Sequence, residues 1–274
     1  MRLLLTLHST KEKQSITINY QYPIASAIYR ILKNADAEYA AFLHEKGYGK
    51  GFKLFTFSDI KCPFKIQGDR LILLTDKIEL VVCFHLPEAA ETFIKGIFIS
   101  QQIDIADKKS KATFIIEQVS SLASPLEKYK NDDELEVLLR PLSPIVCGLK
   151  NENGIYTFLS PEDDRYEEML FSNWHEKVKA IYESTEADYL MKDAFVEIIF
   201  LRNPPKSRLL TIKAFTTAET KIRGFVNFNL RIRGRREVVE LLLNSGVGLY
   251  NAQGMGCVGV EGIEGDWRRD QDEL

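Results

Sequence analysis

Apolar side chains recur every three to four positions between residues 22 and 33, which is the spacing of an amphipathic helix. Asp36 is a preferred N-cap residue, so a second helix is predicted at Ala37–Glu45, where Gly47 would end it. Pro87 suits the first turn of a third helix that runs to about residue 100. The first half of the chain is therefore predicted to contain three helices.

Apolar, strand-like runs lie before, between and after these helices and predict strands. In chain order they are residues 2–9, 52–57, 70–85 with a hairpin turn at 75–77, and 112–119. With one extra helix, the order is strand, helix, strand, strand, helix, strand. This is the order of a ferredoxin-like fold.

The second half of the chain repeats this order. Ser160 is predicted to cap, and Pro161 to open, a long helix to about residue 184, and a short helix begins at Arg235. Strands are predicted at residues 135–142, 194–201, 208–215, 220–233 and from Met255. We therefore predict an α+β protein of two tandem ferredoxin-like domains, residues 1–122 and 135–274, joined by a polar linker at 123–134.

The composition, 45% hydrophobic and 27% charged, is that of a globular protein. No apolar run approaches the roughly 18 to 20 residues of a membrane span, and the first residues lack the features of a signal peptide. We expect a cytoplasmic protein without membrane contact. Four widely separated cysteines fit buried free thiols better than disulfides or a metal site, and no metal is predicted: Cys62, Cys83, Cys147 and Cys257.

The net charge of −3 argues against a nucleic-acid partner on average, but the charge is unevenly distributed. Residues 202–236 carry ten basic residues and the single acid Glu219, which is the footprint of a protein that binds a polyanion. A solvated strand face is the alternative interpretation. The RNA-binding candidates are Arg223, Arg231 and Arg233 on one predicted strand, and Arg235 and Arg236 at the start of the following helix.

Glycines crowd the segment from residue 244 to 262. A dinucleotide-binding fingerprint would follow a strand and open a helix, whereas these glycines follow a helix and precede a strand. Either the segment forms tight turns, or its backbone N–H groups follow the phosphates of a bound nucleic acid. The candidates for the second role are Gly246, Gly248, Gly254 and Gly256.

The segment GVGLYNAQGMGCVGV resembles the C-terminal loop of the RAMP superfamily of RNA-binding proteins. The runs YQYPIASAIY, FLHEKGY and FKLFTFS resemble one branch of it, the sixth CRISPR-associated (Cas) endoribonuclease family, and LRPLSPIVC is a weaker match. The resemblance implies tandem ferredoxin-like domains that bind CRISPR repeat RNA. It also implies cleavage of the precursor transcript inside each repeat, without metal or cofactor, to 2′,3′-cyclic phosphate and 5′-OH ends. Other subunits of a CRISPR effector complex and a second copy of the chain are further partners that it allows.

The family motifs place Tyr29, His44 and Lys53 at the catalytic positions. Metal-free RNA cleavage uses the substrate 2′-OH as nucleophile, so an acid, a base and a cation suffice. The division of acid and base between Tyr29 and His44 stays open, and Lys50 is an alternative cation. Without the resemblance, His44 would be taken for a capping or packing residue and Tyr29 for a core residue. A non-catalytic RNA-binding subunit of the same superfamily is the main alternative function, and a nucleotide-binding enzyme a more distant one.

Overall fold

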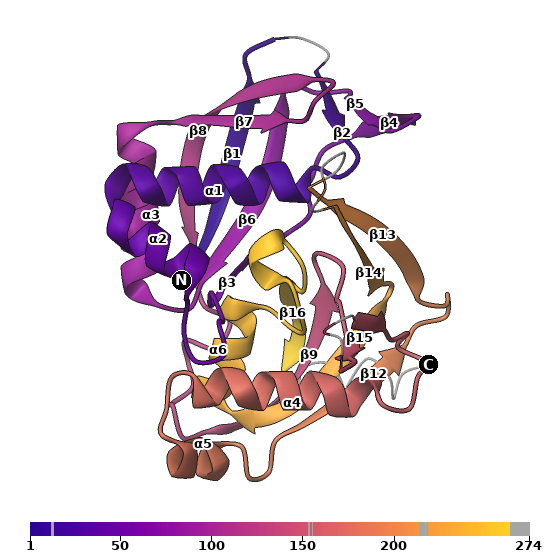
Figure 1. The fold of residues 1–274 in the computed structure, drawn as a ribbon. Helices are drawn as coiled ribbons and strands as arrows, with labels where there is room; N and C mark the ends of the chain where they lie inside the picture. Colours follow the sequence, from indigo (N-terminus) through magenta and orange to yellow (C-terminus); the bar gives the residue numbers. More distant parts are fainter. Residues whose placement is uncertain (12–13, 153, 155, 214–216, 218, 264–274) are drawn as a thin grey trace.

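The computed structural model describes the chain except residues 12–13, 153, 155, 214–216, 218 and 264–274. Two main antiparallel sheets lie one above the other in Figure 1, and each carries helices on one face. The last eleven residues of the predicted second domain lie outside the described part.

The first sheet has the strand order β3-β6-β1-β8-β7. Its strands are β1 (Arg2–Ser9), β3 (Phe55–Phe57), β6 (Lys77–Phe84), β7 (Gln102–Ala106) and β8 (Lys111–Leu122). Every second side chain of β1 is buried, so one face of the sheet packs on helices and forms a core. The helices are α1 (Gln21–Ala35), α2 (Ala37–Glu45), which packs on α1, and α3 (Pro87–Ile99).

The second sheet has the order β12-β15-β9-β16. Its strands are β9 (Glu134–Pro141), β12 (Phe195–Phe200), β15 (Phe228–Arg235) and β16 (Val258–Ile263). Helices α4 (Tyr166–Lys179) and α6 (Arg236–Ser245) cover one face, and α5 (Ser184–Leu190) follows α4. Trp174 is fully buried there and donates its indole N–H to the Val238 carbonyl at 2.9 Å. Both sheets place the first strand of a βαββαβ unit between its third and fourth strands, so the chain consists of two tandem ferredoxin-like folds.

Smaller sheets extend this frame. They are β2 (Ser15–Thr17), β5 (Arg70–Leu73) and β4 (Phe64–Gln67); β10 (Gly148–Lys150) with β11 (Tyr156–Phe158); and β13 (Lys206–Ile212) with β14 (Thr220–Val226). The hairpin predicted around residues 75–77 is wrong, because β5 pairs with β2 and β4 while β6 pairs with β1 and β3.

Two further predictions are corrected. The strand predicted at residues 220–233 breaks at Asn227, whose φ of 70° turns the chain, so Arg223 lies on β14 while Arg231 and Arg233 lie on β15. The long helix predicted from Pro161 begins only at Tyr166 and ends at Lys179, because residues 161–165 form turns in which the Asp163 side chain accepts the backbone N–H of Arg165.

The glycine-rich loop (residues 246–256) joins the two halves of the molecule. It follows α6, contains the short 3-10 helix η1 (Asn251–Gln253), and lies against β3 of the first sheet. Thr56 of β3 donates its hydroxyl to the Met255 carbonyl at 2.9 Å. Ala252 packs with the first hydrophobic core, and Leu54 from the first half packs with the second. Three of the free cysteines, Cys83, Cys147 and Cys257, are buried as predicted.

Candidate active site

Tyr29 lies in the second half of α1 and is partly buried. Its ring meets the His44 imidazole edge-on with centroids 5.1 Å apart, and it meets Phe55 of β3 at 5.6 Å. Burial raises the pKa of the Tyr29 hydroxyl. The phenol therefore stays protonated near neutral pH, where it can donate a hydrogen bond but is a poor base.

His44 lies in the last turn of α2. As predicted, Asp36 caps the start of this helix, since its carboxylate accepts the Tyr39 backbone N–H at 2.8 Å. The cap fixes where the helix begins and hence which residues its last turn brings to Tyr29. His44 is exposed, so its imidazole can exchange protons with solvent or substrate.

Lys53 immediately precedes Leu54, whose left-handed φ of 52° turns the chain into β3. This turn sends Leu54 into the second core while Lys53 lines a cavity beside Tyr29 and His44. Partial burial lowers the pKa of Lys53. Lys50, the alternative cation, is instead held by Glu176 at 2.7 Å and does not line the cavity.

The three predicted catalytic residues meet in a cavity of about 260 Å³ between the two halves. Its other walls are residues 51–54, Asn173 and Lys177 of α4, and the loop from Gly248 to Gln253. An adjoining hollow of about 510 Å³ shares Tyr29, His44, Tyr250 and Gln253 with it and extends toward hairpin β13–β14. Among the described residues that line these two hollows there is no Asp or Glu, so both favour an anion.

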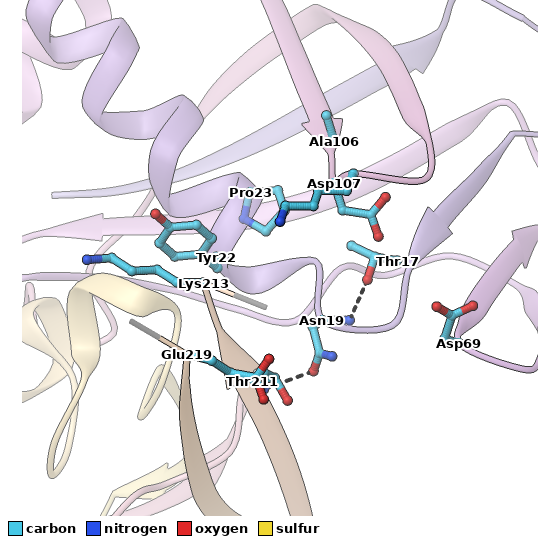
Figure 2. Close-up of a pocket in the computed structure, with 11 residues that line it drawn as sticks. Thr17, Asn19, Tyr22, Pro23, Asp69, Ala106, Asp107, Thr211, Lys213 and Glu219 are labelled. Carbon is cyan, nitrogen blue, oxygen red and sulfur yellow. Dashed lines mark hydrogen bonds between the residues drawn. The ribbon is translucent and has the colours of Figure 1, made fainter. Parts of the chain in front are cut away.

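A third hollow, of about 500 Å³, has a different character. Figure 2 shows it beside the start of α1, where Asn19 donates its backbone N–H to Thr17 and accepts the backbone N–H of Thr211. Its walls include three carboxylate residues, Asp69, Asp107 and Glu219, against two lysines, Lys108 and Lys213. A polyanion would thus be disfavoured here relative to the cavity beside His44.

Lys177 was not predicted to be part of the site. Its side chain is almost completely buried, and its ammonium donates to the Gly246 carbonyl at 2.5 Å, to Asn251 Oδ1 at 2.7 Å and to the Gly248 carbonyl at 3.4 Å. Desolvation lowers the pKa of Lys177 to about 7. Its position on the buried stripe of α4, three residues after Trp174, was the signal in the sequence that something must satisfy this charge.

The four predicted loop glycines are all buried and have positive φ, between 68° and 87°. The backbone N–H groups of Gly246, Gly254 and Gly256 donate to the carbonyls of Leu242, Asn251 and Pro144. These three amides are therefore already hydrogen-bonded within the chain, and their predicted phosphate-following role stays a prediction. At Gly248 a Cβ would lie 2.3 Å from the Val146 carbonyl oxygen, so close packing requires glycine there too.

The arginines of β15 and α6 are held by acids, three of them outside the arginine's own element and one, Glu240, one turn further along α6. The pairs are Arg231 with Glu197 (2.8 Å), Arg233 with Glu134 (2.8 Å), Arg235 with Asp132 (3.2 Å) and Arg236 with Glu240 (3.2 Å). None of these arginines lines the cavity. The positive segment of the sequence is therefore balanced in space. Arg223 on β14 is exposed and, within the described part of the chain, has no ion pair; it contacts Ser207 Oγ at 3.5 Å.

Comparison with known proteins adds independent evidence. Residues 15–120 match the N-terminal family of CRISPR-associated protein Cas6, and residues 127–260 match the C-terminal family of the same protein. The chain belongs to the Cas6 family. Within the described residues of this family member, no helix is long and apolar enough to cross a membrane.

Two relatives carry the name CRISPR-associated endoribonuclease. One, from Methanocaldococcus jannaschii, is 25% identical over 94% of this chain and 92% of its own length. The other, from Pyrococcus furiosus, is 22% identical over 96% of this chain and 90% of its own length. A solved structure of a Cas6-related protein from Pyrococcus furiosus covers 95% of this chain and 98% of its own, with a TM-score of 0.74 at 21% identity. That last similarity supports the fold.

Proposed function

We propose that this Cas6-family protein binds CRISPR repeat RNA and cuts the precursor transcript within the repeat. The observation that carries the proposal is the meeting of Tyr29, His44 and Lys53, from three separate elements, in a cavity without carboxylates. A site that cleaves a phosphodiester must lack negative charges that would repel the substrate. It must also supply groups for proton transfer and a positive charge. The names of the two archaeal relatives, both endoribonucleases, agree with it.

The reaction needs no nucleophile from the protein. The 2′-oxygen of the RNA attacks the adjacent phosphorus, the bond from phosphorus to the 5′-oxygen breaks, and a 2′,3′-cyclic phosphate and a 5′-OH result. Lys53 stabilises the negative charge that grows on the phosphoryl oxygens. The 2′-OH gives up its proton as the 2′-oxygen attacks, and the departing 5′-oxygen takes one up. His44 carries out one of these two transfers and solvent water the other, while the protonated Tyr29 hydroxyl orients the reacting oxygens by donating a hydrogen bond. These roles require neither a metal nor a cofactor.

The two halves divide the work in this proposal. Residues 1–122 contribute the catalytic side chains, and residues 135–274 contribute the glycine-rich loop and the arginine of β14. Arg223 is the phosphate contact that we retain from the predicted basic strand, because its charge is not balanced by a neighbouring acid in the described chain. Cytoplasmic location, association with other CRISPR subunits and dimerisation remain part of the hypothesis.

The test is cleavage of a labelled repeat RNA in excess EDTA. Wild type should cut once, and His44→Ala should cut about 10²- to 10⁴-fold more slowly while binding with nearly unchanged affinity. A single 2′-deoxy nucleotide at the cut should abolish cleavage and leave binding intact. Lys53→Met and Lys50→Met form a matched pair, of which only the first should lose activity.

Binding without any cut by wild type would overturn the proposal in favour of the non-catalytic RNA-binding subunit. Cleavage that survives the 2′-deoxy substitution would refute attack by the 2′-oxygen. Cleavage that disappears in EDTA and returns with a divalent cation would refute metal independence.

A further inference from the structure

Tyr250 occupies a central place in the site without having a role in the chemistry above. It belongs to the glycine-rich loop and, like Tyr29 and His44, lines both the 260 Å³ cavity and the adjoining 510 Å³ hollow. A group that lies beside the catalytic residues at the junction of two acid-free hollows is well placed to contact the nucleotide next to the cut.

The backbone of Tyr250 is held in an unfavourable conformation. Its φ of 59° and ψ of 30° lie in the left-handed region, which an aromatic residue rarely adopts. Hydrogen bonds on both sides maintain it: Leu249 N–H donates to the Val146 carbonyl and Gln253 N–H to the Tyr250 carbonyl, at 2.8 and 2.9 Å. Such strain persists where the surroundings enforce it, and it is concentrated at functional sites.

The loop that carries Tyr250 is locked from within. Asn251 receives the Lys177 ammonium on its Oδ1 and donates its side-chain amide to the carbonyls of Val247 and Met255, both at 3.0 Å. This arrangement fixes the path of the chain immediately after Tyr250. The backbone that carries the ring is therefore set before any ligand binds, which lowers the entropy lost on binding.

The ring of Tyr250 has no parallel stacking partner within the described residues. Tyr156 meets it edge-on, with centroids 6.0 Å apart and planes at 65°, and Phe158 is tilted against it at 6.4 Å and 56°. These contacts support the ring from its sides. A flat heteroaromatic ring from a ligand could stack on it.

A hydrogen-bonding group lies three residues further on. Gln253 lines the same two hollows, and its Oε1 is buried without a hydrogen-bond partner in the described structure. A buried polar atom without a partner is costly unless a ligand supplies one. A carboxamide can both donate and accept hydrogen bonds, as the edge of a nucleobase requires.

We propose that Tyr250 and Gln253 form a nucleobase subsite beside the catalytic residues. The base next to the cut stacks on the Tyr250 ring, and the Gln253 carboxamide hydrogen-bonds its edge. This inference rests on the proposed function, because it takes the occupant to be the RNA whose phosphate faces Lys53. It adds selectivity for one base to a site whose catalytic side chains contact only phosphate and sugar oxygens.

The test uses repeat RNA with a 2′-deoxy nucleotide at the cut, so that it binds without reacting, and with 2-aminopurine placed in turn on each side of the cut. Stacking quenches the fluorescence of this base. Tyr250→Asn removes the ring but keeps a residue that tolerates the left-handed backbone, so the fold is retained. Tyr250→Phe keeps the ring, and Tyr189→Leu removes an exposed tyrosine outside the cavity.

We expect quenching at one of the two positions with wild type, Tyr250→Phe and Tyr189→Leu, and none with Tyr250→Asn. Affinity should fall about 5- to 150-fold in Tyr250→Asn. An abasic nucleotide at the quenched position should weaken RNA binding by wild type by a similar factor. The same nucleotide should weaken RNA binding by Tyr250→Asn only a little further. Gln253→Ala should reduce discrimination between bases at that position alone.

Quenching that persists in Tyr250→Asn, no quenching at either position, or independent effects of the abasic nucleotide and the substitution would overturn the subsite. Cleavage is not needed for this measurement. A failure of the proposed function appears separately, as an absence of cutting by wild type on the all-ribose RNA.

Discussion

Among the single residues of this molecule, Lys177 is unusual because its ammonium group is buried. Within the described chain it has no carboxylate partner and is satisfied by two carbonyls and an amide oxygen, all from the glycine-rich loop. Moving a charge out of water is costly, and these three acceptors offset the cost only in part. Lys177 therefore acts by holding the loop, and its protonation state should affect stability.

The stability of the protein should depend on pH through this group. Folding lowers the pKa of Lys177 from 10.5 to about 7. Between these pH values the unfolded chain binds more protons, so the free energy of unfolding rises with pH, by up to about 1.4 kcal/mol per unit. Lys177→Met should lack this increment, because the substitution removes the Lys177 amine and leaves the other residues that line the cavity in place.

Urea unfolding of wild type and Lys177→Met at several pH values from 7 to 9 measures the difference. The free energy of unfolding of wild type should exceed that of Lys177→Met by an amount that grows steadily as pH rises. A constant difference over this range would show that Lys177 keeps an ordinary pKa in the folded state.

The candidate catalytic residues could be predicted from the sequence only through family motifs. Composition and spacing alone did not distinguish Tyr29 from a core residue or His44 from a packing residue. For Lys177, the buried stripe of α4 indicates only that the charge needs partners, because the loop that supplies them lies about 70 residues later. Tyr250 was missed because only the packing of the loop brings it beside Tyr29 and His44.

At the scale of elements, the glycine-rich loop depends on the space that glycine leaves. A Cβ at Gly254 would lie 2.3 Å from the Phe57 ring, and its φ is 80°. Gly254→Ala should lower the free energy of unfolding by about 2 to 4 kcal/mol, since overpacking adds to backbone strain. Cleavage should fall with it, because the loop forms one wall of the cavity.

Gly68→Ala provides the control. This glycine also has positive φ, 60°, but nothing lies within 4 Å of an added Cβ. It should lose only about 1 kcal/mol from the backbone term. Equal losses at the two positions, measured by chemical denaturation, would show that contact with Phe57 does not constrain the loop.

Elements whose signals are local were well predicted. Asp36 caps α2 and Pro87 opens α3 as expected, and the strands predicted at residues 2–9 and 135–142 agree with β1 and β9 to within one residue. Elements that depend on pairing partners were not. The run from residue 70 to 84 is one continuous β-like stretch in sequence, yet its two strands join different sheets. Similarly, only the positive φ at Asn227 separates β14 from β15.

At the scale of the whole molecule, charge in sequence and charge in space differ. Nearby acids pair with Arg231, Arg233, Arg235 and Arg236, whereas the hollows beside His44 carry no carboxylate among the described lining residues. Attraction of RNA should therefore depend on the cavity and on hairpin β13–β14 more than on the paired arginines of β15.

Salt dependence separates these surfaces. Arg223→Gln should reduce the slope of log affinity against log salt concentration by about 1, as the loss of one phosphate contact requires. Arg233→Gln should change it by much less, because that guanidinium is already paired with Glu134. The measurement is the affinity of both variants for repeat RNA at three or more salt concentrations. Equal changes in slope would show that Arg233 contacts a phosphate as well as Arg223, as the sequence predicted.

Leu54 of the first half packs in the second core, and Ala252 of the second half packs in the first core. This exchange of side chains affects the order in which the site is completed during synthesis. Tyr29, His44 and Lys53 leave the ribosome early. The wall that completes their cavity, from Gly248 to Gln253, is made about 200 residues later. A chain that has been synthesised only as far as Lys53 thus has the three candidate catalytic side chains without this wall, and the closed cavity forms only after the loop has emerged.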